Sequence, residues 1–254
     1  MRLWIAIGLC GCDRLLGLSP VRPLDAAIDS RYPPYVSAVL ADSPVGYFRL
    51  DETTGVAAVD LVGGPNGTYV GNVMLAQPGA FSDANTSVGF DGANSAVTLA
   101  DRFDFTGTKP FSLEAWIRPS FQGTFHELGS RWQVPPGRAG YTWYQDGDGI
   151  GFERDASDAQ TDLAAVSGVL VENQWTYVVA TYDGATMAIY VSGRQITTIA
   201  SATAIPEVGL ATMIGAASGE ADQSPFLGGI DEYAIYDHAL TPERVDAHFA
   251  AATP

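Results

Sequence analysis

The stretch from residue 175 to residue 199, WTYVVATYDGATMAIYVSGRQITTI, constrains the fold more than any other part of the sequence. It consists of three short runs of alternating residues, and Asp183-Gly184 and Ser192-Gly193 stand between them as turn residues. The first run carries large apolar side chains at both odd and even positions, which is typical of a strand buried on both sides. The stretch therefore predicts three consecutive antiparallel strands. Because a sheet with two apolar faces needs a second layer, the rest of the chain must supply one.

Composition places the chain among all-β proteins. Of its 254 residues 46% are hydrophobic, and its 28 Gly and 15 Pro follow no fixed period, so many short strands and tight turns are expected in one large domain. The net charge is −16 and Lys109 is the only lysine, which disfavours binding to a nucleic-acid backbone. We therefore expect one all-β domain with no nucleic-acid partner.

Short strands are expected on both sides of the 175–199 stretch, and the clearest is FSLEAWIR, which alternates apolar and polar residues. They are expected at 45–50, 67–70, 87–90, 96–99, 111–118, 125–130, 141–145, 149–154, 163–166, 211–215 and 229–236. A turn of helix is expected at 37–41. A short C-terminal helix is expected after Thr241, which can cap it ahead of Pro242.

The N-terminus is typical of an exported protein. The apolar run 3–9 is too short to span a bilayer, and Leu9-Cys10-Gly11-Cys12 after it resembles a bacterial lipobox, which predicts lipidation of Cys12. An ordinary secretory signal with two incidental cysteines, or a mis-assigned start codon, are the alternatives. We divide the chain into a signal segment at 1–12, a proline-containing tether at 13–34 and a domain at 35–254. Both cysteines lie in the signal segment, so no disulfide can stabilise the domain.

Four segments of the domain carry a family resemblance. They are AVLADSPVGYFRLDETTGVAAVDLVGGPNGTYVG, FSLEAWIRP, QWTYVVATYDGATMAIYVSGRQI and FLGGIDEYAIYDHALTPERV. Together they resemble the concanavalin A-like, laminin G-like domains of bacterial surface proteins over about Tyr35 to Ala250. The resemblance implies a two-sheet antiparallel jelly-roll sandwich. It does not imply one ligand, because the family includes sugar-binding modules, adhesion domains and appendages to enzymes.

Catalysis is not expected. Glycoside hydrolases that resemble this fold carry Glu-x-Asp-x-x-Glu or a close variant on one strand, and we identify no such run. Glu114 is isolated in the sequence, and alternation places Asp231 and Glu232 on opposite faces of the last strand. The three histidines lie outside any Gly-x-Ser-x-Gly turn, which disfavours a serine-hydrolase site.

A structural calcium ion is the cofactor that the resemblance implies, bound between the N-terminal segment and the last strand. The matching acids are Asp60 and Asp231. The alternative is that Asp60 caps a turn and that Asp231 accepts backbone hydrogen bonds. Asp146-Gly147-Asp148 also suggests a calcium loop, but its spacing fits a hairpin turn better than an EF-hand.

Aromatic and polar residues beside loops are the candidate ligand contacts. Aromatic rings can stack on the apolar face of a sugar, and neighbouring polar groups can bond its hydroxyls. The candidates are Trp132, Gln133, Trp143, Tyr144 and Asp146. Packing in the core is the alternative for Trp143, and Trp132 is the stronger candidate.

Two functions remain open from the sequence. The first is a non-catalytic binding module at the bacterial cell envelope or outside the cell, anchored in the membrane by a lipid, that recognises a glycan or an extracellular protein. The second is a structural or assembly domain of the envelope with no small-molecule ligand. A glycoside hydrolase of the same fold is a third and less favoured possibility.

Overall fold

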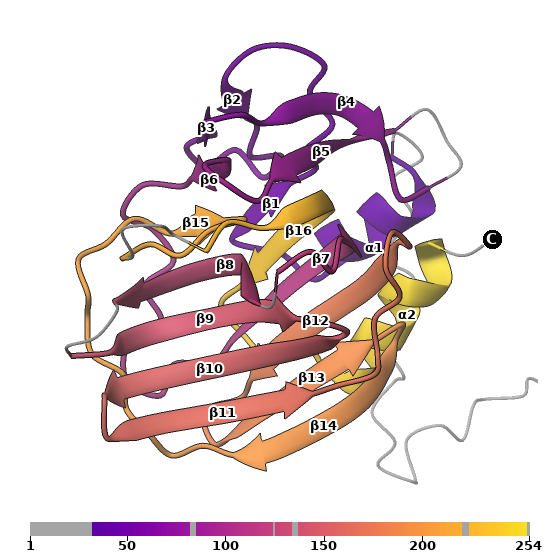
Figure 1. Ribbon diagram of the computed structural model, residues 1–254. Coiled ribbons are helices and arrows are strands. Elements are labelled where there is room, and N and C mark those ends of the chain that lie inside the picture. Colours follow the sequence, from indigo (N-terminus) through magenta and orange to yellow (C-terminus); the bar gives the residue numbers. More distant parts are fainter. Residues whose placement is uncertain (1–31, 82–84, 124, 134–136, 220–223, 253–254) are drawn as a thin grey trace, which may run out of the picture.

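A computed structural model describes residues 32–81, 85–123, 125–133, 137–219 and 224–252, which form two antiparallel sheets and two helices (Figure 1). The first sheet has the strand order β14-β13-β12-β7-β16-β5-β4, with β1 also paired to β16. The second sheet has the order β11-β10-β9-β8-β15-β6-β3-β2. The expected two-sheet, all-β sandwich with a short C-terminal helix is therefore confirmed.

The bounds of the elements follow. The first sheet consists of β1 Gly46–Phe48, β4 Met74–Pro78, β5 Thr86–Asp91, β7 Phe111–Pro119, β12 Thr176–Tyr182, β13 Thr186–Val191, β14 Arg194–Ala200 and β16 Leu227–Tyr236. The second consists of β2 Ala57–Ala58, β3 Gly67–Val70, β6 Ala96–Thr98, β8 Phe125–Gln133, β9 Ala139–Asp146, β10 Gly149–Ser157, β11 Gln160–Val166 and β15 Met213–Ile214. The helices are α1 Pro34–Ala41 and α2 Pro242–Ala252.

The three-stranded stretch at 175–199 lies in the first sheet as β12, β13 and β14, and both faces of β12 are buried as expected. Val178 and Ala180 face the core between the two sheets. Tyr177 and Val179 face the other way, into a second apolar cluster that includes Val36 of α1 and Val245 of α2. The two helices therefore supply a third layer that covers the outer face of the first sheet.

The structure differs from the expected elements at the N-terminal end of the domain. The short strands β2 and β4 were not expected, and α1 is a helix of eight residues rather than one turn. It begins at Pro34, because proline is well suited to the first helical position, so the last residue of the expected tether belongs to the domain.

A β-bulge in β16 contradicts the expected faces of its acids. Asp231 pairs with Trp116, whereas the next pair on this side joins Ala234 to Glu114, so the register shifts between them. Glu232 in the bulge has a positive φ of 54°. Both carboxylates therefore lie on the outer side of the first sheet, where Asn85 donates to each of them. The extra residue of a bulge breaks the alternation on which the expectation depended.

The N-terminal residues 1–31 lie outside the part of the chain that the structure describes. The expected signal segment, the lipidation of Cys12 and nearly all of the tether lie outside the described residues. Among the residues that are described, no helix is both long and apolar enough to cross a membrane.

Candidate functional site

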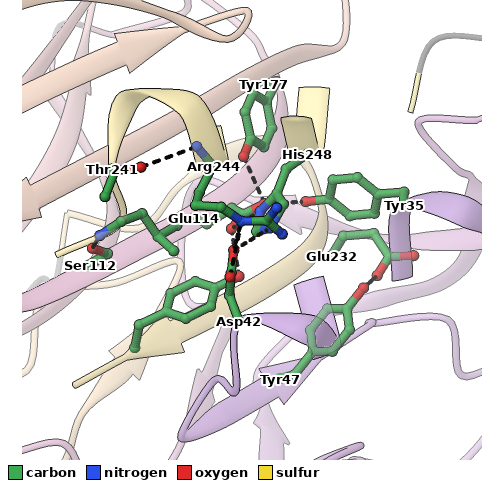
Figure 2. Close-up of polar contacts among 12 residues, drawn as sticks. Tyr35, Asp42, Tyr47, Ser112, Glu114, Tyr177, Glu232, Thr241, Arg244 and His248 are labelled. Carbon is green, nitrogen blue, oxygen red and sulfur yellow. Dashed lines mark hydrogen bonds and ion pairs between the residues drawn. The ribbon is translucent and has the colours of Figure 1, made fainter. Parts of the chain in front are cut away.

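A buried polar cluster lies on the outer side of the first sheet, beneath the two helices (Figure 2). Its centre is the carboxylate of Glu114 on β7, which is wholly buried. The Glu114 carboxylate accepts hydrogen bonds from the hydroxyls of Tyr35 and Tyr177 at 2.8 Å and of Tyr236 at 2.7 Å. The Nδ1 of His248 lies 3.1 Å from both of its oxygens. Glu114 thus contacts four polar side chains, although its position in the sequence gave no sign of these partners.

His248 of α2 extends the cluster to Asp42, the acid at the C-terminal end of α1. Its Nε2 lies 2.9 Å from Asp42 Oδ2, and Arg244 of α2 donates to the same carboxylate at 2.7 Å. Burial opposes the charged imidazole, but Glu114 and Asp42 outweigh that effect and raise the pKa of His248 to about 9. Because Glu114 and His248 are wholly buried, we assign this cluster to the attachment of α1 and α2 rather than to chemistry on a ligand.

A second set of polar residues lies on the outer face of the second sheet, which neither described helix covers (Figure 1). Direct cross-strand partners point to the same side of a sheet. Glu153 is the partner of Thr142 and Leu163, and Asp155 and Trp132 are both partners of Gly140. We call this surface the acidic face and define it by Glu127, Ser130, Trp132, Thr142, Tyr144, Glu153, Asp155 and Leu163.

Two carboxyl groups interact directly on the acidic face. Burial, followed by the charge of Asp155 and a hydrogen bond with it, raises the pKa of Glu153 to about 7. Asp155 is wholly buried, and its Oδ2 accepts the indole N–H of Trp132 at 2.5 Å. Among the described residues, its Oδ1 has no hydrogen-bond partner. The Nη1 of Arg138 lies 3.0 Å from Glu153 Oε1 and opposes the rise in pKa.

The acidic face adjoins a surface hollow at one end. The ring of Phe125 lies 4.3 Å from that of Tyr144, measured between centroids. Phe125 also lines a hollow of about 270 Å³ together with Gly92, Ala93, His126, Ser224 and Pro225. The loop that follows β15 borders this side of the face, because the N–H of Glu127 donates to the carbonyl of Ser224 at 2.9 Å. A ligand on the face therefore has room to extend beyond Tyr144.

Of the five expected ligand residues, two lie on the acidic face, and a third, Asp146, points to the same side of the sheet at the end of β9. Trp132 and Tyr144 lie there, with 5% and 8% of their surfaces exposed. Trp143 does not: it is wholly buried between the sheets, where its indole donates to the hydroxyl of Tyr233 at 3.1 Å, so its interpretation as a ligand contact is wrong. Gln133 is exposed at the end of β8 and donates to the carbonyl of Gly137, and Asp146 is exposed at the opposite end of β9.

The acids of the face were missed in the sequence, although a signal was present. Glu153 and Asp155 stand two residues apart on β10, and Asp158 follows, which gives Glu-x-Asp-x-x-Asp. This run differs from the hydrolase pattern only in its last acid. Asp158 is exposed and accepts the backbone N–H groups of Gly137 and Arg138 at 2.8 and 2.9 Å, so it holds a loop rather than facing a ligand.

The surroundings of the two expected calcium ligands suit hydrogen bonds better than a cation. Asp60 accepts the backbone N–H groups of Tyr47 and Val62 through Oδ1, and it forms an ion pair with Arg102 through Oδ2 at 2.9 Å. Asp231 accepts the backbone N–H of Ala80 at 2.8 Å. The described residues contain no group of three or more acidic, histidine or cysteine side chains placed to hold a metal. Calcium binding here stays a prediction from the family resemblance, without support from these contacts.

Comparison with known proteins agrees with this architecture. Residues 91–246 match the laminin G-like family described as the Concanavalin A-like lectin/glucanases superfamily. The chain belongs to this superfamily. The match includes β7 to β16, and so contains both the acidic face and the central carboxylate of the buried cluster. No curated protein sequence matches the chain.

Solved structures with this superfamily fold include binding domains of botulinum neurotoxins. The binding domain of serotype D is 15% identical, with a TM-score of 0.60 over 84% of this chain and 52% of that structure. The serotype G binding domain is 12% identical, with a TM-score of 0.61 over 82% and 50%. A serotype D ligand-binding domain in complex with N-acetylneuraminic acid is 14% identical, with a TM-score of 0.61 over 84% and 52%. The chain spans about half the length of these structures, and at this identity the likeness concerns the fold.

Proposed function

We propose that the chain is a non-catalytic module that binds saccharide on the acidic face of its second sheet. The observation that carries this proposal is the combination of aromatic rings and carboxylates on one sheet face that neither described helix covers, with Leu163 exposed at its edge strand. Trp132 and Tyr144 can contact the apolar side of a sugar ring, while Glu153 and Asp155 can accept hydrogen bonds from hydroxyl groups. Solved structures of the same fold include one in complex with N-acetylneuraminic acid and one whose function involves gangliosides, which supports saccharide as the class of ligand.

Glycoside hydrolysis is the second candidate, and the raised pKa of Glu153 favours it because a general acid must be protonated near neutral pH. The arrangement of the acidic residues disfavours glycoside hydrolysis. Retaining hydrolases hold two carboxyl groups about 5 to 5.5 Å apart on either side of the bond that is cleaved. The third acid of the pattern is the one that fails: Asp158 is exposed and its carboxylate is bound to the backbone amides of Gly137 and Arg138. Release of reducing ends from a bound oligosaccharide would decide for hydrolysis.

The same proposal places the module at the bacterial cell envelope, tethered by a lipid on Cys12. Its support is the lipobox-like sequence that ends at Cys12 and the following proline-containing segment. The non-binding alternative, a structural domain of the envelope, predicts that no saccharide binds.

A glycan array probed with the Cys12→Ala chain, which cannot be lipidated at that position, tests the proposal. We expect binding to a restricted set of glycans and a loss of binding in Leu163→Ala, because Leu163 lies 43% exposed on the acidic face. Ile196→Ala is the matched control, since Ile196 is 41% exposed on β14 of the other sheet. A blank array contradicts saccharide binding, and equal losses in both variants contradict its location.

A further inference from the structure

The acidic face carries more negative charge than its own side chains neutralise. Glu153 and Asp155 lie on it as neighbouring acids, and among the described residues the guanidinium of Arg138 is paired with Glu153. The arginines of the same strands point to the other side. Arg131 binds Asp101 and Glu207, and Arg154 lies over the ring of Tyr182 between the sheets. With a net charge of −16, the chain as a whole adds to the negative potential of the face.

Arg138 shows which kind of group this surface accepts. Its guanidinium is 3.0 Å from Glu153 and lies over the ring of Trp132, 5.5 Å from the centroid. The indole N–H of Trp132 in turn donates to Asp155. The aromatic ring and the paired carboxyl groups therefore form a cradle for a cation. The Arg138 side chain is itself 38% exposed, so a ligand can displace it without opening the core.

The buried carboxylate of Asp155 is a second and independent indication that the ligand carries hydrogen-bond donors. It is wholly buried, and its Oδ1 has no hydrogen-bond partner within the described structure. Buried acceptors that lack a donor are costly, so a ligand that brings N–H groups would relieve this cost, whereas a carboxylate-bearing ligand would increase it.

We propose that the acidic face recognises a basic saccharide, one that carries free amino groups, and that Arg138 holds the position of the ligand's ammonium group until the ligand binds. This inference rests on the saccharide-binding function proposed above and adds the charge class of the ligand. An ammonium group over Trp132 gains a cation–π contact and donates charge-assisted hydrogen bonds to the carboxylates of Glu153 and Asp155. A neutral amide at the same position gains neither.

Calorimetric titration of the Cys12→Ala chain at pH 6 and low salt tests this inference. The probes are a hexamer of glucosamine, the hexamer of N-acetylglucosamine, which differs only by acetylation of the amines, and sialyllactose as an acidic sugar. We expect the glucosamine hexamer to bind about tenfold more tightly than the acetylated one, as for a charge-assisted hydrogen bond. We also expect this preference to weaken with added salt and sialyllactose not to bind.

The variant Arg138→Ala gives the sharpest test, because the sign of its effect depends on the charge of the ligand. Removal of the competing cation should tighten binding of the glucosamine hexamer by about threefold or more. If Arg138 instead served as the contact for an anionic or neutral sugar, the same change would weaken binding. Arg194→Ala removes an equal charge from β14 on the other sheet and should leave the affinity unchanged.

The outcomes separate this inference from the function on which it rests. Equal or tighter binding of the acetylated hexamer, or of sialyllactose, overturns the basic-saccharide inference and leaves saccharide binding in place. Weaker binding of the glucosamine hexamer by Arg138→Ala overturns the role assigned to Arg138. Failure of all three probes overturns the inference, whereas the proposed function falls only if the glycan array is blank as well.

Discussion

At the scale of single residues, the raised pKa of Glu153 determines how the acidic face responds to pH. The pKa of Glu153 is raised from its ordinary value of 4.5 to about 7, first by burial and then by the charge of Asp155. The folded protein therefore binds a proton on Glu153 more tightly than the unfolded chain does. The stability that Glu153 contributes is therefore complete below pH 4.5 and is lost as the pH rises to about 7.

Glu153→Gln should remove this pH dependence. We expect the variant to be more stable than the parent chain at pH 8 by about 2 kcal/mol, because glutamine places no second negative charge beside Asp155. At pH 4.5 the two proteins should be nearly equal in stability. Urea unfolding at the two pH values measures the difference. A variant that is less stable than the parent at pH 8 would show that Glu153 is held as a stabilising carboxylate by Arg138.

The sequence predicted Trp132 and Tyr144 as ligand contacts and gave Trp143 two interpretations, ligand contact or core packing, which it could not decide between. All three lie in or beside the same pair of strands, and which side of the sheet each faces depends on register and on a bulge between Glu127 and Gly129. Asp155 was missed as a candidate site residue because the sequence does not show its contacts. The folded sheet brings its carboxylate to the indole of Trp132, and its charge acts on Glu153.

At the scale of elements, the buried cluster around Glu114 attaches both helices to the first sheet. Tyr35 of α1 and His248 of α2 bond the same carboxylate on β7 (Figure 2). Sequence patterns predicted the buried strand, the C-terminal helix and one turn of α1, because each leaves a local pattern of alternation, capping or proline. They could not predict the cluster, since its members come from four distant segments of the chain.

Glu114→Gln should destabilise the domain strongly. The change leaves the cationic His248 buried with Asp42 as its remaining acid, and removal of one partner of a buried ion pair costs about 3 kcal/mol or more. In a domain of this size that corresponds to roughly 10 °C in melting temperature. Asp246→Asn on the exposed side of α2 is the control and should melt like the parent. An unchanged melting temperature for Glu114→Gln would contradict the role of the cluster.

The attachment of α2 should also weaken in alkali. The pKa of His248 is raised from 6.5 to about 9, so its contribution is complete below pH 6.5 and is lost as the pH rises to 9. We expect the unfolding free energy to fall by about 2 kcal/mol across this range. His248→Gln should flatten the dependence, and His238→Gln, at a partly exposed site, should not. A parent protein of constant stability from pH 6.5 to 9 would show that His248 is neutral in the fold.

At the scale of the whole molecule, the outer faces of the two sheets have different roles. The outer face of the first sheet is covered by helices and stabilises the domain, whereas neither described helix covers the outer face of the second, which carries the candidate binding site. The sequence predicted the sandwich because turn residues and alternating runs set many short strands, and because four segments resembled one family. It could not predict this division, since both outer faces contain aromatic and acidic residues.

Lipidation of Cys12 is a prediction about the whole molecule, and it concerns a segment outside the described residues. We expect labelled palmitate to be incorporated into the full-length chain expressed in a bacterial host, because Cys12 ends a lipobox-like sequence. Acyl chains would then hold the protein at the membrane, at about 0.8 kcal/mol per buried methylene. Cys12→Ala should lose the label. Label that persists in this variant, or a parent protein found wholly in the soluble fraction, would refute the anchor.

The central claim is that ligand binds on the outer face of the second sheet, and the indole N–H signals of the tryptophans test it most directly. The chain has 5 tryptophans, of which Trp132 lies on the acidic face, Trp143 in the core and Trp116 beneath the helices. We would record proton–nitrogen correlation spectra of the Cys12→Ala chain during titration with the tightest-binding saccharide of the array. The account predicts that the Trp132 signal shifts progressively, because its N–H donates to Asp155 at the site, while the Trp116 signal stays in place. A saturable shift of Trp116 with an unmoved Trp132 signal would contradict it.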